Sequence, residues 1–217
     1  MGEIISYMER KVEAKGLNPY ALPREKDVLK YLFEDEAKNL ELLNEISPFN
    51  LAVSKPHLFY PGSGSDILFP MLYLDRLFPT LNEINMTFVD LEDSIGMIKC
   101  VLDEVGVSFE ENTKSPNNNF NNSEIIFFWN KKKVHLQFVT GDIFELISNL
   151  PAFDIYFEKA FRIMKDSDPD YEKKVLAKLN INGILISDSG FAELPLQKIA
   201  VSTELSAYGE MIMGVKK

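Results

Sequence analysis

Several kinds of residue are scarce in this sequence of 217 residues, and each scarcity excludes a class of protein. The single cysteine, Cys100, cannot form a disulfide within the chain, which excludes a disulfide-stabilised secreted scaffold. The only two histidines, His57 and His135, stand far apart and, with one cysteine, predict no metal site. No apolar run approaches the roughly 20 residues that a membrane-spanning helix needs. We therefore expect a cytoplasmic protein with no bound metal and no membrane partner.

Basic residues are also in deficit, because 23 lysines and arginines stand against 33 aspartates and glutamates, for a net charge of −10. A protein that binds nucleic acid needs clustered lysine and arginine to neutralise phosphates. The one basic run, 131–133, follows Asn130 and predicts a solvated hairpin turn rather than a binding patch. We expect a small-molecule substrate and no nucleic-acid partner, and the sequence leaves the oligomeric state open.

What the sequence does contain is an alternation of apolar strands and amphipathic helices. Strands are predicted at 57–60, 85–90, 124–129, 134–139, 153–158 and 184–187, with another beginning at 107–109 and two extended segments around Gly209. Helices are predicted at 3–15, 24–46, 67–78, 94–105 and 169–179, and the Asn-rich segment 112–122 predicts a loop. The pair 124–129 and 134–139 predicts an inserted β-hairpin, with its first arm as an edge strand and its second arm in the core. The alternation favours an α/β fold with a mostly parallel sheet covered by helices on both faces.

The segment 60–66, Tyr-Pro-Gly-Ser-Gly-Ser-Asp, separates the first of these strands from its helix. Gly62 and Gly64 allow the backbone to approach a ligand closely, and the N-terminus of the following helix presents free N–H groups. Asp90 closes the next strand 26 residues after Gly64, where a carboxylate can accept both hydrogen bonds of a ribose diol. The pattern predicts a site for a nucleotide-like cofactor.

A second interpretation of Asp90 is open from the residues alone. The carboxylate can instead cap the following helix, in which case Glu92 or Asp93 takes the ribose role. The turn and the acid are also compatible with a nicotinamide cofactor, so an NAD-dependent oxidoreductase is an alternative function.

Five segments together resemble the class I S-adenosylmethionine-dependent methyltransferases, namely LFYPGSGSD, MTFVDLED, FVTGDIFEL, FDIYFEKAF and LNINGILISDSGF. The resemblance covers residues 58–217. It implies a Rossmann-like methyltransferase fold with a mostly parallel, seven-stranded sheet whose last strand is antiparallel. Residues 1–50 are expected to form a helical N-terminal cap of the same domain, and residues 51–217 the Rossmann-like cofactor-binding domain.

The resemblance also implies how S-adenosylmethionine is bound. In that family the glycine-rich turn approaches the methionine and the ribose, the acid after the second strand binds the ribose, and a Gly-Asp after the third strand addresses the adenine. The family usually has an acid two residues before its first glycine, where this sequence has Tyr60, and Asp66 is expected to supply an acid from the other side. The implied cofactor-binding residues are Tyr60, Pro61, Gly62, Ser63, Gly64, Asp66, Asp90, Leu91, Asp142 and Ile143.

Methyl transfer from a sulfonium is an in-line displacement, which needs an aligned acceptor, exclusion of water and, for a protonated acceptor, a general base. Glu158, at the end of the fourth predicted core strand, is the candidate for that base or for holding substrate. Its alternative interpretation is an exposed carboxylate paired with Lys159 or Arg162. The expected function is methyl transfer to an unidentified small or mid-sized acceptor, and a non-catalytic, methyltransferase-like cofactor-binding or interaction protein is the alternative. No Asn/Asp-Pro-Pro-Tyr motif follows this strand, which within the family disfavours methylation of base or glutamine amino groups.

Overall fold

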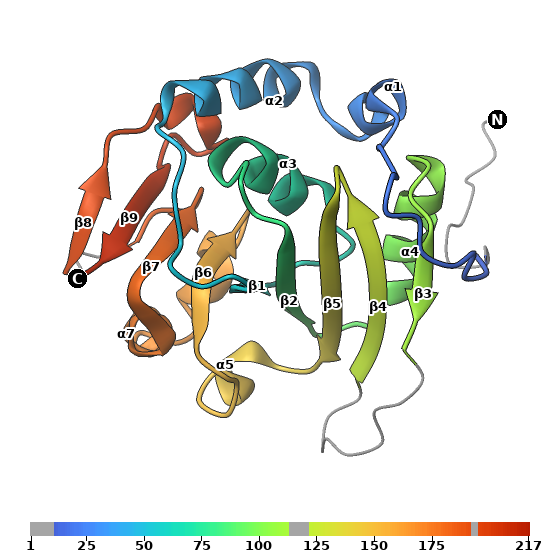
Figure 1. The fold of residues 1–217 in the computed structure, drawn as a ribbon. Coiled ribbons are helices and arrows are strands. Elements are labelled where there is room, and N and C mark those ends of the chain that lie inside the picture. Colours follow the sequence, from blue (N-terminus) through green and yellow to red (C-terminus); the bar gives the residue numbers. More distant parts are fainter. Residues whose placement is uncertain (1–10, 113–121, 192–194) are drawn as a thin grey trace, which may run out of the picture.

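Strand β1 (His57–Pro61) lies in the middle of a mixed β-sheet in the computed structural model, which describes residues 11–112, 122–191 and 195–217 (Figure 1). The strand order is β3-β4-β5-β2-β1-β6-β7-β9-β8. The five central strands, from β5 to β7, are parallel, whereas β4 and β9 are antiparallel to both of their neighbours. The other strands are β2 (Glu83–Asp90), β3 (Phe109–Glu111), β4 (Asn122–Trp129), β5 (Lys132–Thr140), β6 (Phe153–Glu158), β7 (Leu179–Ser187), β8 (Leu196–Ile199) and β9 (Ile212–Lys216).

The predicted alternation of strands and helices is confirmed, including the hairpin formed by β4 and β5. The predicted count of seven strands is wrong, because the residues that the structure describes form a sheet of nine. The two additional strands are short and lie at its edges, where β3 pairs with β4 and β8 pairs with β9. For the same reason β4 is not the edge strand that the hairpin predicted.

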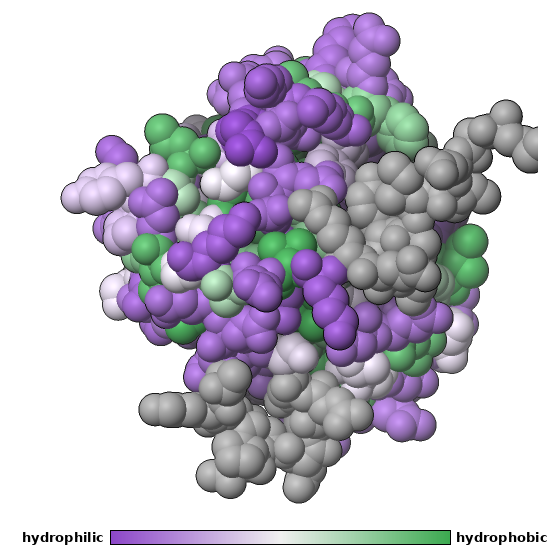
Figure 2. Space-filling view, turned by 90° about the vertical axis from the view of Figure 1, so that its right-hand side faces the viewer, coloured by the Kyte–Doolittle hydropathy of each residue, from purple (hydrophilic) through white to green (hydrophobic). Residues whose placement is uncertain are grey.

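The helices that cover the sheet are short. They are α1 (Glu25–Val28), α2 (Glu34–Asn39), α3 (Leu68–Leu77), α4 (Ile95–Glu104), α5 (Ile143–Leu146), α6 (Arg162–Lys165) and α7 (Tyr171–Lys178), with 3-10 turns η2 (Leu29–Tyr31), η3 (Leu40–Glu45) and η4 (Thr203–Leu205). Within the described residues, no helix combines the length and the apolar content that crossing a membrane requires. On the face shown in Figure 2, the described hydrophobic residues are scattered in small patches among hydrophilic ones.

Alternating residues of the central strands feed two separate clusters of apolar side chains, one on each face of the sheet. On β1, Leu58 and Tyr60 belong to the cluster that includes residues of α3 and α4, whereas Phe59 belongs to the cluster that includes residues of α5 and α7. A central parallel strand covered on both faces buries both sets of side chains, and all six residues of β6 are buried. Apolar packing on both faces of the sheet therefore fixes the position of β1.

The predicted helix 24–46 is wrong as a continuous element, because the structure divides it into α1, η2, α2 and η3. Leu32 is extended, with φ −107° and ψ 141°, and its side chain packs against the main apolar cluster. Glu36 then accepts a 3.0 Å hydrogen bond from the Phe33 amide and so starts α2. In Figure 1, α2 lies above α3, and α1 lies to the right of both.

Two other predictions fall partly or largely outside the described residues. Of the predicted helix 3–15, residues 11–15 have no regular secondary structure, and residues 1–10 are not described. The predicted loop 112–122 coincides almost entirely with the undescribed residues 113–121.

Candidate functional site

The turn between β1 and α3 depends on both of its glycines, for different reasons. Gly62 and Gly64 have φ of +57° and +50°, a backbone conformation that favours glycine. A Cβ at Gly62 would lie 2.5 Å from a ring carbon of Phe161, so a side chain does not fit there. A Cβ at Gly64 would meet no atom within 4 Å, so this residue faces open space. The turn is thus packed on one side and open on the other.

Asp90 ties together the turns that follow three neighbouring strands. Its Oδ2 accepts a 2.8 Å hydrogen bond from the Gly64 amide, and its backbone oxygen accepts one of 2.8 Å from the Gly141 amide after β5. Its Oδ1 accepts only a long 3.4 Å contact from the Glu92 amide among the described residues. The alternative that Asp90 caps α4 is wrong, because Asp93 Oδ1 accepts from the Ile95 amide at 3.1 Å. The carboxylate stands at the carboxyl end of β2 with acceptor capacity left over.

Tyr60 and Asp66 form a pair across the base of the turn. The Tyr60 hydroxyl donates a 2.9 Å hydrogen bond to Asp66 Oδ2, while Asp66 Oδ1 accepts from the Phe69 amide at 3.0 Å. Burial raises the pKa of the Asp66 carboxyl, an effect opposed by these hydrogen bonds and by Lys159. Burial also raises the pKa of Tyr60 well above its ordinary value, so its side chain is a neutral phenol. A carboxyl group therefore lies within hydrogen-bond distance of the Tyr60 hydroxyl, on Asp66.

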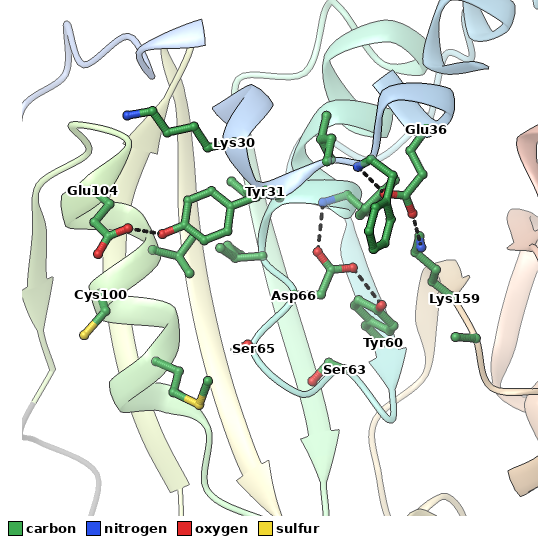
Figure 3. A pocket seen from close by; sticks show the side chains of 18 of the residues that line it. Lys30, Tyr31, Glu36, Tyr60, Ser63, Ser65, Asp66, Cys100, Glu104 and Lys159 are labelled. Atoms are coloured by element: carbon green, nitrogen blue, oxygen red, sulfur yellow. Dashed lines mark hydrogen bonds and ion pairs between the residues drawn. The ribbon is translucent and has the colours of Figure 1, made fainter. Parts of the chain in front are cut away.

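A cavity of about 730 Å³ opens beside this turn, within the range of about 300–1,000 Å³ typical of small-molecule sites. Its walls come from η2 and α2, the turn and the start of α3, α4, and the residues after β6 (Figure 3). Of the predicted cofactor residues, Tyr60, Gly62, Ser63 and Asp66 line it. The other lining residues are Lys30, Tyr31, Leu32, Phe33, Glu36, Ser65, Ile67, Leu68, Phe69, Met97, Cys100, Val101, Glu104, Lys159 and Ala160.

Two polar contacts in this cavity were not predicted from the sequence. Lys159 Nζ lies 2.9 Å from Glu36 Oε1 and 4.1 Å from the centre of the Phe69 ring. On the other side of the cavity, the Tyr31 hydroxyl donates to the Glu104 carboxylate (Figure 3). Both contacts join residues far apart in sequence, so local pattern carried no signal for them. They attach the N-terminal segment to α4 and to the residues that follow β6.

The remaining predicted cofactor residues lie at the same edge of the sheet without lining this cavity. Asp142 accepts a 2.9 Å hydrogen bond from the Phe144 amide and so caps α5, and Ile143 is buried beneath it. Leu91, next to Asp90, is 72% exposed. Pro61 ends β1. The structure therefore groups all ten predicted residues at the carboxyl ends of β1, β2 and β5.

Glu158 is placed differently from either sequence interpretation. It is 1% exposed, and its carboxylate pairs with Lys165 at 2.7 Å and accepts hydrogen bonds from the hydroxyls of Tyr156 and Ser187. The alternative of an exposed pair is wrong, because Lys159 pairs with Glu36 and Arg162 with Glu210. Burial raises the pKa of the Glu158 carboxyl, and the Lys165 ammonium opposes that rise. Its partners lie on the opposite face of the sheet from the cavity.

The two histidines lie away from the cavity. His57 Nδ1 contacts the Ala152 carbonyl at 3.1 Å and its Nε2 contacts Thr87 Oγ1 at 2.9 Å, whereas His135 Nε2 lies 2.8 Å from Glu83. Across the described ranges, no group of three or more His, Cys, Asp or Glu side chains is placed to hold a metal ion.

Comparison with known proteins finds similarity in structure only. No protein-family model and no curated protein matches the sequence. Solved structures similar to the chain include TrmN from Thermus thermophilus (TM-score 0.40, 15% identity, 82% of this chain and 46% of that one). Two others are a SAM-dependent methyltransferase from Geobacter sulfurreducens in complex with S-adenosyl-L-homocysteine (0.39, 13%, 71% and 47%) and precorrin 8w decarboxylase from Methanobacterium thermoautotrophicum (0.38, 14%, 71% and 61%).

The chain spans about half to three fifths of the length of these three proteins. Identities of 13–15% and TM-scores below 0.5 do not establish a shared family. The function of this chain is therefore inferred from its own residues.

Proposed function

We propose that this protein binds S-adenosylmethionine at the carboxyl edge of its sheet and transfers the methyl group to a small or mid-sized acceptor. The observation that carries the proposal is the hydrogen bond between the Gly64 amide and Asp90. It holds an acid with a spare oxygen beside a turn that is open on its ligand side, next to a cavity of sufficient volume. In an open α/β sheet, ligands bind at this edge, where the strand order reverses.

The residues present fit the parts of this cofactor. Asp90 Oδ1 is available to a ribose hydroxyl, and Gly64 leaves room for close approach of the ligand. Asp66, in its partly buried site, can hold an ammonium group in place of the acid that Tyr60 replaces. Leu91 offers an exposed apolar surface next to the ribose acid, and Asp142 with Ile143 closes the end where the adenine would lie.

When bound, the cofactor supplies an electrophilic methyl group on a sulfonium. The chain's own residues would then position the acceptor and exclude water, which is most of what an in-line displacement requires. The 1–50 segment would act as the cap of the 51–217 domain, since Tyr31 and Glu36 reach the cavity walls. We assign Glu158 to anchoring Lys165 and Ser187 rather than to proton transfer, since its carboxylate is closed to solvent.

We further propose a small-molecule acceptor and a cytoplasmic location. A net charge of −10 opposes binding to a phosphate backbone, and a single buried cysteine, Cys100, outside any disulfide suits a reducing compartment.

Calorimetric titration separates this function from its alternatives. The protein is titrated with S-adenosylmethionine, S-adenosylhomocysteine and NADH, and the same titrations are made with Asp90→Ala. The matched control is Glu92→Gln, which removes a neighbouring exposed charge. We expect binding of the two methionine-derived ligands, a loss of at least about tenfold in Asp90→Ala, and little change in the control. Binding of NADH alone would instead support an oxidoreductase, and binding of none by the folded protein would contradict both.

A further inference from the structure

A second cavity, of about 340 Å³, lies directly beside the first. It is enclosed by α2, α3, the residues that follow β6 and β7, and the segment 204–207. Glu36, Phe69 and Lys159 line both cavities. The full lining is Asp35, Glu36, Asn39, Leu40, Phe69, Tyr73, Lys159, Asp188, Glu204, Leu205, Ser206 and Ala207. A group bound here would adjoin a cofactor bound in the larger cavity.

The lining of this second cavity carries an excess of negative charge. Its one basic residue, Lys159, is paired with Glu36. The carboxylates of Asp35, Asp188 and Glu204 have no basic partner among the described residues. Asp35 and Glu204 are exposed, so the buried negative charge of this cavity belongs to Asp188.

Asp188 is 5% exposed, and only one of its two carboxylate oxygens accepts hydrogen bonds from the described residues. Its Oδ1 accepts hydrogen bonds from the Ala160 amide at 2.8 Å and from the Ser189 hydroxyl at 2.7 Å. Its Oδ2 accepts none from the residues that the structure describes. A buried carboxylate oxygen with spare lone pairs favours a cationic or hydrogen-bond-donating ligand.

Tyr73 is a second, independent indication that this cavity binds a ligand. It is 5% exposed, its ring packs edge-on against Phe157 at 5.2 Å, and its hydroxyl has no hydrogen-bond partner among the described residues. Burial and the nearby Asp188 carboxylate raise the pKa of this phenol, so it is neutral. Buried polar groups are nearly always paired, and an unpaired one marks an absent ligand or water.

We propose that this second cavity binds the ammonium group of the methyl acceptor, and that the acceptor is a small amine with an apolar body. An ammonium has three N–H donors, which Asp188 Oδ2 and the Tyr73 hydroxyl can accept. The apolar side chains of Leu40, Phe69 and Leu205 line the same space and would contact the rest of the molecule. The inference of a cation site depends only on these contacts. The inference that the cation is the methyl acceptor rests on the proposed methyl transfer.

The test compares two probes of the same shape, phenethylamine and the neutral 2-phenylethanol. Each is titrated by calorimetry into the intact protein, both free and saturated with S-adenosylhomocysteine. We expect the amine to bind at least about tenfold more tightly than the alcohol, as a charge-assisted hydrogen bond implies. We also expect the amine to bind while S-adenosylhomocysteine is in place.

Two variants locate the site, and one serves as a control. Asp188→Asn should weaken amine binding at least about tenfold and leave the alcohol unchanged, and Tyr73→Phe should weaken the amine about threefold. Glu145→Gln removes an exposed charge on α5, outside both cavities, and should change neither. Tyr73→Phe removes a hydroxyl without a partner, so it decides the question even if Asp188→Asn does not fold.

Equal binding of the two probes, or amine binding that neither variant weakens, would overturn the cation site whether or not S-adenosylhomocysteine binds. Loss of S-adenosylhomocysteine binding with amine binding intact would keep the cation site and overturn its acceptor role. The two failures are therefore distinct.

Discussion

The backbone amide of Gly64 donates a 2.8 Å hydrogen bond to Oδ2 of Asp90, which lies at the end of the adjacent parallel strand. This bond makes the acid part of the turn's own structure as well as a candidate ligand contact. It also explains how a turn with two left-handed glycines is held in one conformation. A substitution that changes the conformation of the turn should therefore also move the Asp90 carboxylate.

The first prediction concerns the two glycines of this turn. Gly62→Ala should destabilise the protein more than Gly64→Ala does. Both substitutions strain the backbone by about 1–2 kcal/mol, but only the Gly62 Cβ would also overlap the Phe161 ring, adding about 1–3 kcal/mol. Gly64→Ala should instead lower the affinity for S-adenosylmethionine, since its Cβ enters the open side. Urea unfolding and calorimetry measure the two effects.

The double variant Gly62→Ala, Phe161→Leu is the control for this prediction. A smaller side chain at 161 should restore part of the lost stability, because the overlap is with that ring. Equal destabilisation by the two single variants would contradict the packing argument.

The spatial grouping of the candidate site residues was predictable where it depends on local sequence pattern. The relevant sequence signals are strand β1, the two glycines and the acid that closes β2. They lie within about 30 residues of one another, since parallel neighbours in this fold are joined by one crossover helix. The structure brings these signals together at one edge of the sheet. The contact between Asp66 and the Tyr60 hydroxyl is local as well, because only six residues of this turn separate them.

The rest depends on contacts that no local pattern encodes. Glu36 and Lys159 are separated by 123 residues, and their pairing follows from how the N-terminal segment crosses the sheet. Leu32 falls on the apolar stripe of the predicted helix, but its backbone is extended and its side chain packs against the apolar cluster. Tertiary packing therefore overrides helix propensity here. Glu158 looked accessible at a strand end, yet helix α6 brings Lys165 back over it.

The second prediction concerns this buried pair. Lys165→Met should destabilise the protein by about 3–5 kcal/mol, because it leaves the Glu158 carboxylate buried without a counter-charge. Glu158→Gln should be less damaging, since Lys165 keeps Glu172 at 3.1 Å and the Gly190 carbonyl. Urea unfolding gives both values.

Lys174→Met serves as the matched control for the buried pair. It breaks a half-exposed pair with Asp168 and should cost no more than about 1 kcal/mol. If Lys165→Met lowers the free energy of unfolding no more than Lys174→Met does, Glu158 is not buried as described.

The third prediction concerns Asp75, which joins α3 to the β4–β5 hairpin. Its carboxylate accepts from Trp129 Nε1 at 2.8 Å, Asn130 Nδ2 at 2.6 Å and Lys132 Nζ at 2.7 Å. Asp75→Ala leaves the buried Lys132 ammonium unpaired and should cost about 3–5 kcal/mol. Trp129 is the only tryptophan, so its emission should shift to longer wavelength in this variant.

The neighbouring pair of Arg76 with Glu41 provides the comparison. Glu41 is 68% exposed in this pair, so Glu41→Ala should cost less than about 1 kcal/mol and leave the emission unchanged. An unshifted emission in Asp75→Ala would contradict the anchoring role.

The fourth prediction concerns the pH dependence of stability and rests on His57. Burial lowers the pKa of this imidazole below its usual 6.5, and the Ala152 carbonyl and Asp154 only partly oppose the shift. The carbonyl can only accept, so Nδ1 carries the hydrogen and Nε2 accepts from the Thr87 hydroxyl at 2.9 Å. Protonating Nε2 would reverse that second contact, because the Thr87 hydroxyl would then have to accept instead of donate.

Because the folded pKa of His57 lies below the unfolded one, the unfolded state binds more protons between the two values. The stabilisation is complete above about pH 6.5 and falls as the pH drops through that window, by at most about 1.4 kcal/mol per pH unit. Proton NMR of the two histidine rings should give His57 a midpoint below 6.5. His57→Gln should flatten the pH dependence of unfolding, and His135→Gln, at a partly exposed ring, should flatten it less. A His57 midpoint at or above 6.5 would mean that burial does not keep this ring neutral.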